Sequence, residues 1–288
     1  MHGFHLTGII PVAGQPLDFE MPWHDSLMPI SQNYLAVERA VVECAYAGCE
    51  TIWVVCNFDM QPLIRHRLGD YVSDPVWAHR SFDQFASTKK KLIPIYYVPV
   101  HPRDQKKRDC LAWSVIYGAW MARKVSGGLS QHLEPDMYYV SFPYGVYDPS
   151  LLREHRDLIS KKEPFYLSNN NKTVVDGEYL GFTICEESLK QLNLEVKIKS
   201  TGLYEDEERT KKLSLEERFS YRFFTIGEVF DTLSLEESNI INIDNYWNID
   251  SWEGYTEYIA SGSKAISRPH KNIMSYKEWD GIGVDEEF

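Results

Sequence analysis

The chain has 288 residues, 43% of them hydrophobic, which is enough to bury a sizeable core in one large α/β domain or two small ones. Its formal net charge of −12 disfavours general binding of DNA or RNA, because an acidic surface repels a phosphate backbone. The sequence has no apolar run long enough to cross a bilayer and no N-terminal signal-peptide pattern, so we expect a cytoplasmic protein without a membrane partner. The five cysteines form no C-x-x-C pair, and we expect reduced thiols that act as small apolar side chains.

The N-terminal part of the chain has the pattern of a parallel α/β unit. Residues 4–12 are apolar and predict a buried first strand, which runs into a turn at Gly14 where backbone N–H groups can approach a phosphate. After a long loop, Ser31 can cap an amphipathic helix that Gly48 ends, and the apolar run 51–56 predicts a second buried strand. This order is that of a right-handed β-α-β unit.

Strand and helix patterns alternate through the middle of the chain, with residues 70–91 as an insertion. We expect strands over residues 92–100 and 137–142, and helices over residues 60–68, 111–125 and 148–159. The pair Gly127 and Gly128 is expected to end the second of these helices.

In the second half the pattern changes to short elements, without an internal repeat. We expect a small mixed β region over residues 165–200 and a polar tail over residues 263–288. Three apolar side chains could anchor that tail to its own subunit or to another: Tyr276, Trp279 and Ile282. The expected strands here are 172–175, 178–184, 239–243 and 246–249, and the expected helices are 186–192, 215–224, 226–233 and 252–260. Residues 1–262 thus predict one domain, a three-layer α/β/α Rossmann-like fold with a mostly parallel central sheet.

Five segments of the chain, in one order from about residue 6 to residue 260, resemble the nucleotidyltransferases that activate sugars or related small phosphates. That family includes the sugar-1-phosphate nucleotidyltransferases and their molybdenum-cofactor and isoprenoid-pathway relatives. The matching segments are 8–14 (GIIPVAG), which resembles the first strand and glycine loop, 26–30 (SLMPI), 45–55 (AYAGCETIWVV), 176–184 (DGEYLGFTI) and 247–255 (WNIDSWEGY). The resemblance implies a nucleotidyltransferase fold of the GT-A-like type.

The resemblance also implies a reaction, in which a sugar phosphate attacks the α-phosphate of an NTP and pyrophosphate leaves. Such an enzyme needs a loop around the triphosphate, cations against the developing negative charge, and carboxylates that hold Mg²⁺. Its partner would be a nucleotide or nucleotide sugar. The implied positions are Ala13, Gly14 and Gln15 at the nucleotide, Tyr144, Gly177 and Glu178 at the sugar, Asp250 as metal ligand and catalytic residue, and Asp25 as a second catalytic candidate.

The chain departs from the family pattern where the phosphates would bind. The family loop reads G-x-G-T-R and ends in P-K. Here Pro16, which has no N–H, replaces the second glycine, the arginine is absent, and Asp25 stands where the lysine is expected. Tyr144 stands where the family's first metal aspartate closes the fourth strand, and Asn248 where another aspartate often sits. A basic loop after strand 92–100 could replace the absent cations or be a solvated charge run: Arg103, Lys106, Lys107 and Arg108.

Each candidate residue also has an ordinary structural interpretation. Gly14 could simply turn the chain, and Asp250 could cap the helix that begins at residue 251 or 252. His24 could be a general acid or base or a plain surface residue. The loop carboxylates could be solvated or could bind a cation in a rebuilt site: Asp18, Glu20 and Asp25.

Two functions therefore stay open. The first is a divergent nucleotidyltransferase that binds an NTP or nucleotide sugar and transfers NMP to a sugar phosphate, with Mg²⁺ at Asp250. The second is a catalytically inactive member of the fold that acts as a binding or assembly protein, which the loss of the loop arginine, the lysine and one aspartate favours. A glycosyltransferase with a related sheet needs a D-x-D pair after the fourth strand, and residues 142–148 supply none.

Overall fold

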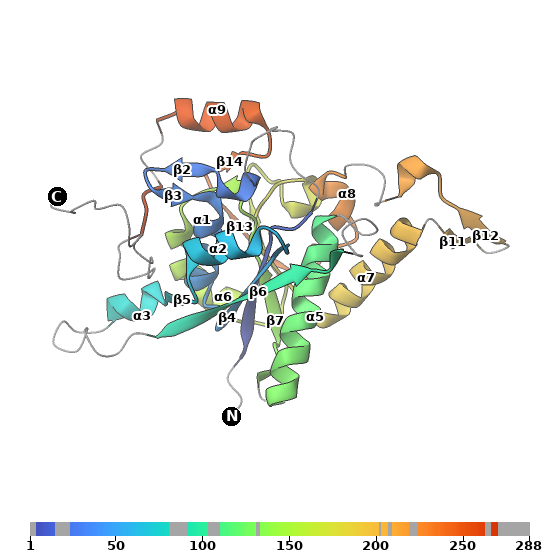
Figure 1. The fold of residues 1–288 in the computed structure, drawn as a ribbon, viewed down its shortest axis with the longest axis horizontal. Coiled ribbons are helices and arrows are strands. Elements are labelled where there is room, and N and C mark those ends of the chain that lie inside the picture. The colour runs from blue at the N-terminus through green and yellow to red at the C-terminus, as the bar shows by residue number, and fades with distance from the viewer. Residues whose placement is uncertain are drawn as a thin grey trace.

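The computed structural model describes residues 4–14, 24–80, 91–102, 110–130, 133–201, 203–206, 209–218, 224–262 and 266–269. They form a central sheet with helices on both faces, which confirms the predicted α/β class and its mostly parallel sheet (Figure 1). In this part of the chain, no helix combines the length and the apolar character needed to cross a membrane.

The central sheet has eight strands in the order β13-β9-β10-β7-β1-β4-β6-β5. Four neighbours in its middle, β7, β1, β4 and β6, run parallel, and β13 runs parallel to β9. β10 is antiparallel to both of its neighbours, and β5 is antiparallel to β6. The strands are β1 (Leu6–Pro11), β4 (Thr51–Asn57), β5 (Tyr71–Ser73), β6 (Leu92–Val100), β7 (Met137–Val140), β9 (Phe165–Ser168), β10 (Phe182–Ile184) and β13 (Asn239–Asn242). Residues 165–200 thus contribute two strands to the main sheet, and residues 70–91 contribute its edge strand.

The sheet is buried on both faces by helices. Successive side chains of a strand point to opposite sides, so each strand contributes to both apolar layers. In β1, Ile10 packs in an apolar cluster with side chains of α1 and α2, and Ile9 packs in a second cluster with side chains of α5, α7 and α8. Of the five free cysteines, four are buried in these layers, as expected for small apolar side chains. The helices are α1 (Ala36–Ala47), α2 (Gln61–Leu68), α3 (Pro75–Arg80), α5 (Leu111–Leu129), α6 (Arg156–Ile159), α7 (Glu186–Thr201), α8 (Ile226–Phe230) and α9 (Trp252–Ala260).

Three short two-stranded pairs lie outside the main sheet. They are β2 (Pro29–Ser31) with β3 (Tyr34–Leu35), β8 (Gly145–Val146) with β14 (Trp247–Asn248), and β11 (Leu203–Asp206) with β12 (Arg209–Lys212). The β8–β14 pair joins the segment after β7 to the late segment before α9. It therefore brings together two parts of the chain that lie about a hundred residues apart in sequence.

Apolar runs between glycines predict the parallel strands and their helices well. The strands expected at residues 51–56 and 92–100 and the helix expected at residues 252–260 are confirmed. Gly48 ends α1 in the left-handed conformation, with φ of 95°.

Three local predictions are wrong, each because of a nearby backbone interaction. Ser31 does not cap α1, since it lies in β2 and the helix begins after Leu35. α5 continues through Gly127 and Gly128 to Leu129, because neither glycine adopts a left-handed conformation and a glycine only weakens a helix. Residues 172–175 are not a strand, because the chain turns tightly at two left-handed asparagines just before them and then enters the 3-10 turn Val174–Asp176, which the Thr173 side chain caps.

Two expected helices are shorter or less regular than predicted. Residues 148–159 form the 3-10 helix Pro149–His155 followed by α6, although the Asp148 side chain caps its start as expected. The region 215–224 contains the 3-10 turn Leu215–Glu217, and α8 covers only part of the expected helix 226–233.

The described part of the C-terminal tail packs on the domain. Ile266 is buried in the core cluster, and the charge of Arg268 acts on the buried carboxylate of Glu38. Just before the tail, α9 is also attached to the domain, because its Tyr258 hydroxyl donates to the Ile30 carbonyl at 2.7 Å. The tail residues Tyr276, Trp279 and Ile282 lie outside the described residues.

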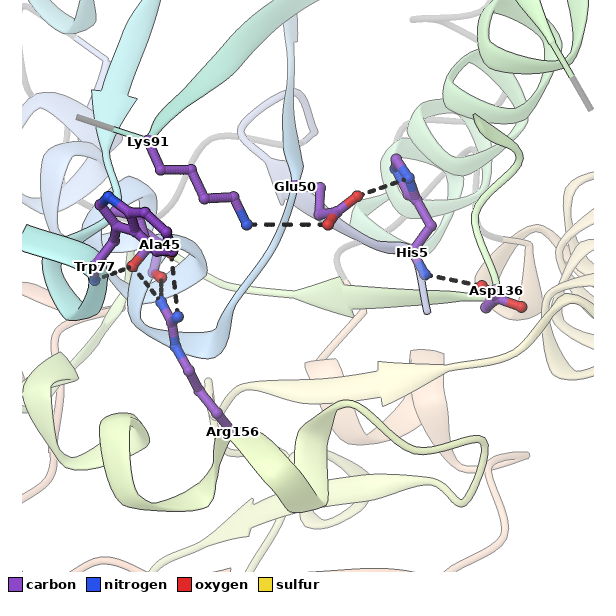
Figure 2. A network of polar contacts seen from close by, with 8 residues as sticks. His5, Ala45, Glu50, Trp77, Lys91, Asp136 and Arg156 are labelled. Atoms are coloured by element: carbon purple, nitrogen blue, oxygen red, sulfur yellow. Dashed lines mark hydrogen bonds and ion pairs between the residues drawn. The ribbon is translucent and has the colours of Figure 1, made fainter. Parts of the chain in front are cut away.

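Polar contacts tie the amino ends of the four parallel strands together (Figure 2). The Glu50 carboxylate, just before β4, contacts the His5 ring at 3.2 Å and the Lys91 ammonium at 3.9 Å. The His5 backbone N–H, just before β1, donates to Asp136 at 2.8 Å, just before β7. The carboxyl ends of the same parallel strands lie at the opposite edge of the sheet. In open α/β sheets, ligands bind at that edge.

Candidate functional site

The first element of the candidate site is the turn after β1. The backbone N–H groups of Val12 and Ala13 both donate to the Val55 carbonyl at 2.8 Å, and the Ser114 hydroxyl donates to the Ala13 carbonyl. The polar backbone groups of Ala13 are therefore used within the protein. Gly14 follows in an extended conformation against Leu111, where its N–H has no hydrogen-bond partner among the described residues.

The chain returns to the same edge of the sheet at His24. The Nδ1 atom of His24 accepts a hydrogen bond from the Ser26 N–H at 3.2 Å, so this side chain caps the 3-10 turn Asp25–Leu27. The Val12 carbonyl accepts a hydrogen bond from the ring. Burial lowers the pKa of His24, against the charges of Asp25 and Asp59, and keeps the ring neutral. His24 is thus a structural link between the loop and the end of β1.

The Asp25 carboxylate is close enough to Tyr144 for its charge to act on the phenol, although the two residues are 119 positions apart in the sequence. The Asp25 residue is only 6% exposed and Tyr144 only 4%. Burial, aided by the charge of Asp25, raises the pKa of Tyr144 far above its usual value, so the phenol stays protonated. The Tyr144 ring meets the ring of Tyr179 edge-on, with centroids 5.4 Å apart.

The late segment brings Asp250 to the same place. The Ile249 N–H donates to the Tyr144 carbonyl at 2.9 Å, next to the β8–β14 pair. Burial raises the pKa of Asp250 and the charge of Glu178 adds to this, while a hydrogen bond from the Asn248 side chain acts in the opposite direction. The cap alternative for Asp250 is wrong, because the Ser251 side chain caps α9.

Glu178 is positioned by a glycine turn. Gly177 adopts the left-handed conformation, with φ of 100°, and ends the 3-10 turn before it. The Glu178 side chain accepts a hydrogen bond from the Tyr246 hydroxyl, which in turn accepts one from the Tyr179 N–H at 2.9 Å. Burial raises the pKa of Tyr246 far above its usual value, so this phenol remains a donor.

The structure therefore gathers several predicted residues at one edge of the sheet, in a connected set. We call it the tyrosine–carboxylate cluster, and its members are Asp25, Tyr144, Glu178, Tyr179, Tyr246 and Asp250. Sequence reasoning missed Tyr179 and Tyr246, although each lies within four residues of a chosen carboxylate. The predicted nucleotide-binding residues Gln15, Arg103, Lys106, Lys107 and Arg108, together with Pro16, Asp18 and Glu20, lie outside the described residues.

Comparison with known proteins bears on the fold of the chain. No protein-family model matches the chain, and no curated protein matches its sequence. One similar solved structure is a Bacillus anthracis protein assigned as a glucose-1-phosphate thymidylyltransferase, in complex with sucrose; it is 10% identical, with a TM-score of 0.54 over 93% of this chain and 98% of its own. Another is a UDP-glucose pyrophosphorylase complexed with UDP-glucose, 13% identical, with a TM-score of 0.53 over 91% of this chain and 99% of its own. The chain has the nucleotidyltransferase fold.

This version of the nucleotidyltransferase fold has a sparse set of metal donors. Among the residues that the structure describes, no group of three or more His, Cys, Asp or Glu side chains is placed to hold a metal ion. Asp250 and Glu178 are close enough for the charge of one to act on the other. Mg²⁺ is often held by one or two carboxylates together with substrate phosphate oxygens and water. The donors fit Mg²⁺ only as part of a site that a bound phosphate completes.

Next to the site, the nucleotidyltransferase fold of this chain contains a buried ion pair that sequence reasoning missed. Arg39 and Glu43 of α1 lie 2.8 Å apart and their side chains are fully buried. The available signal was a pair of opposite charges four residues apart in a helix with apolar residues all around it. All twelve residues of α1 are in fact buried, so a solvated face for this pair does not exist.

Proposed function

We propose that this chain binds a nucleotide or nucleotide sugar at the carboxyl edge of β1 and β7, and transfers NMP to a sugar phosphate with release of pyrophosphate. The observation that carries the proposal is the tyrosine–carboxylate cluster. Asp25, Tyr144, Glu178 and Asp250 come from four separate segments, and all four were chosen from sequence alone. Their meeting at the edge where α/β sheets bind ligands supports a functional rather than an incidental role.

The sugar would lie against the tyrosine side of this cluster. Glu178 is half-buried and its orientation is fixed by the Tyr246 hydroxyl, so it can accept hydrogen bonds from sugar hydroxyl groups. Tyr144 and Tyr179 are buried and their hydroxyls stay protonated, so we propose that they form the floor beneath the sugar and not an open wall beside it. The hydroxyl groups on the rim of a pyranose ring suit Glu178 as their acceptor.

The nucleotide phosphates would lie nearer the turn after β1. There the Gly14 N–H is a backbone donor, whereas the Ala13 N–H already bonds to Val55. We propose that the basic residues Arg103, Lys106, Lys107 and Arg108 supply the cations that the turn lacks. The described residues on either side of this segment, at the end of β6 and the start of α5, lie at the same edge of the sheet, where Gly14 packs against Leu111.

In the proposed reaction an oxygen of the sugar phosphate forms a bond to the α-phosphorus of the NTP, and the bond from that phosphorus to the bridging oxygen breaks. Pyrophosphate leaves with the bonding electrons, and positioning with charge neutralisation supplies most of the catalysis. Mg²⁺, when bound with the phosphates, would supply charge neutralisation there, with Asp250 as its protein ligand. Asp25 would act through its charge, which favours the protonated form of the Tyr144 hydroxyl.

One observation favours the second function, binding without transfer. Tyr144, which stands where the family's first metal aspartate is expected, is buried against Tyr179 beside the buried Asp25. A site built in this way could retain a nucleotide sugar and lack the second metal carboxylate that transfer needs.

Calorimetric titration tests the binding proposal. The ligands are UTP, dTTP, UDP-glucose and dTDP-glucose, each with and without Mg²⁺. We expect dissociation constants below a millimolar for at least one, and no binding by any of them would refute the proposal. Asp250→Asn should abolish the Mg²⁺ dependence, whereas the control Asp244→Asn, which removes an exposed carboxylate nearby, should not. Release of pyrophosphate from the bound NTP with a panel of sugar phosphates then distinguishes transfer from binding alone.

A further inference from the structure

The buried ion pair Arg39–Glu43 contacts both ends of the segment that carries Tyr144. At the beginning of that segment, Arg39 Nη2 donates to the Phe142 carbonyl. At its end, the Tyr147 hydroxyl donates to Glu43 Oε1, and the Arg39 guanidinium lies over the Tyr147 ring, 4.6 Å from its centroid. Residues 142–147 are therefore attached to one ion pair at both ends.

The second loop of the site meets the same carboxylate. Gly181, which follows Glu178 and Tyr179 closely, passes so near that a Cβ built on it would lie 2.4 Å from Glu43 Oε1. A side chain at this position is thus excluded by the ion-pair network. Both loops that carry the sugar-side residues of the tyrosine–carboxylate cluster converge on Glu43.

Glu43 is saturated as an acceptor. Oε2 accepts from Arg39 and from the Ser141 hydroxyl, and Oε1 accepts from the hydroxyls of Tyr139 and Tyr147. An ionised carboxylate accepts about four hydrogen bonds, so this arrangement leaves no capacity for another donor. Such a network has one satisfied geometry, and a buried ion pair is weak evidence for added stability, so we look for the role of this pair in the conformation that it specifies.

We propose that Arg39 and Glu43 are positioning residues that set the sugar specificity of the site, by fixing the segment 142–147 and hence the Tyr144 side chain. This inference rests on the proposed nucleotide-sugar binding. It assigns to the pair a role in recognising the sugar and none in holding the base or the phosphates, because among the described residues the turn after β1 makes no hydrogen bond with Arg39 or Glu43.

A matched pair of substitutions tests this role. Tyr147→Phe and Tyr139→Phe each remove one hydroxyl that donates to Glu43 Oε1. Tyr147 lies at the end of the site segment, whereas Tyr139 lies in the middle of β7, where the ladders to β1 and β10 fix it independently. A purely structural network predicts that the two variants behave alike.

The measurement is calorimetric affinity for UDP-glucose against UDP, and for dTDP-glucose against dTDP, with wild type and both variants. We expect Tyr147→Phe to weaken binding of the nucleotide sugar roughly tenfold, equivalent to ~1.4 kcal/mol, with the nucleoside diphosphate unaffected. We expect Tyr139→Phe to leave the ratio of the two affinities at its wild-type value. Arg39→Lys, which keeps the charge and loses the forked donor to Phe142, should follow Tyr147→Phe.

The outcomes separate the two proposals. If wild type binds a nucleotide sugar and the two phenylalanine variants change the affinity ratio equally or not at all, the positioning role is refuted and the binding function stands. If wild type binds none of UTP, dTTP, UDP-glucose and dTDP-glucose, the proposed binding function fails and this inference fails with it. If Arg39→Lys does not fold, the tyrosine pair alone gives the answer.

Discussion

Arg156 binds both carboxylate oxygens of Asp74, at 2.7 and 3.1 Å, and the same guanidinium donates to the Tyr46 carbonyl. It also donates to the Ala45 carbonyl (Figure 2). One side chain from α6 thus closes the C-terminal end of α1, which has carbonyls without helical partners, and holds the residue that precedes α3.

We expect Arg156→Ala to lower the free energy of unfolding by about 2–4 kcal/mol, because it leaves the Asp74 carboxylate buried without its partner. Chemical denaturation measures this. The matched control is Arg65→Ala, which breaks an Arg–Asp pair of similar length on the surface and should cost less than about 1 kcal/mol. Equal losses of unfolding free energy in the two variants would contradict the conclusion that Arg156 compensates the buried charge of Asp74.

Asp250→Asn should stabilise the protein at neutral pH. The folded protein raises the pKa of Asp250, through burial and then the charge of Glu178, so ionisation is less favourable in the folded than in the unfolded chain. Stability associated with this group is fully present at low pH and is lost as the pH rises from the unfolded value of about 3.9 through the folded one. The gain in unfolding free energy, about 0.5–2 kcal/mol at pH 7, should shrink towards pH 4. A melting temperature lowered by the substitution at pH 7 would contradict this.

His24 should make stability fall in mildly acidic solution. Burial lowers its pKa in the folded protein, so the unfolded chain binds more protons once the pH approaches about 6.5, and stability decreases as the pH falls further. His24→Asn keeps a capping side chain but removes the titration. We expect melting temperatures between pH 8 and pH 5.5 to fall less steeply for this variant than for wild type. Equally steep falls in the two proteins would contradict the assignment of this pH dependence to His24.

Two glycine substitutions should have opposite signs. A Cβ at Gly181 would lie 2.2 Å from the Tyr139 hydroxyl, so Gly181→Ala should cost about 1–3 kcal/mol in unfolding free energy through overpacking. A Cβ at Gly128, in the last turn of α5, would meet no atom within 4 Å. Gly128→Ala should therefore add about 0.5–1 kcal/mol, since alanine is the better helix former. A Gly181→Ala variant as stable as wild type would show that the packing around Glu43 does not exclude a side chain at this position.

Sequence reasoning succeeded for elements whose signal is local. The apolar runs at β4 and β6 and the glycine at position 48 specify strands and a helix end without help from the rest of the chain. The order of the strands is not a local property, so it could not be read from periodicity that residues 165–168 and 182–184 would extend the main sheet.

The same difference between local and non-local signals applies to the residues of the candidate site. Asp25, Tyr144, Glu178 and Asp250 could be chosen because a family pattern fixes their positions along the chain. Tyr246 has no such pattern, and its role depends on a hydroxyl reaching Glu178 across a fold that must form first. Arg39 and Glu43 were missed because charged residues at helical spacing are usually solvated, and only the packing of α1 on every side makes them internal.

The contacts among His5, Glu50, Lys91 and Asp136 have a consequence for how this protein could have diverged (Figure 2). They anchor the sheet from the end remote from any ligand, so a changed loop at the opposite end does not loosen the framework. Substitutions in the segments after β1 and β6 should therefore leave the strand order intact. The contacts that fix the framework of this chain and the edge at which we propose that a ligand binds lie at opposite ends of the same strands.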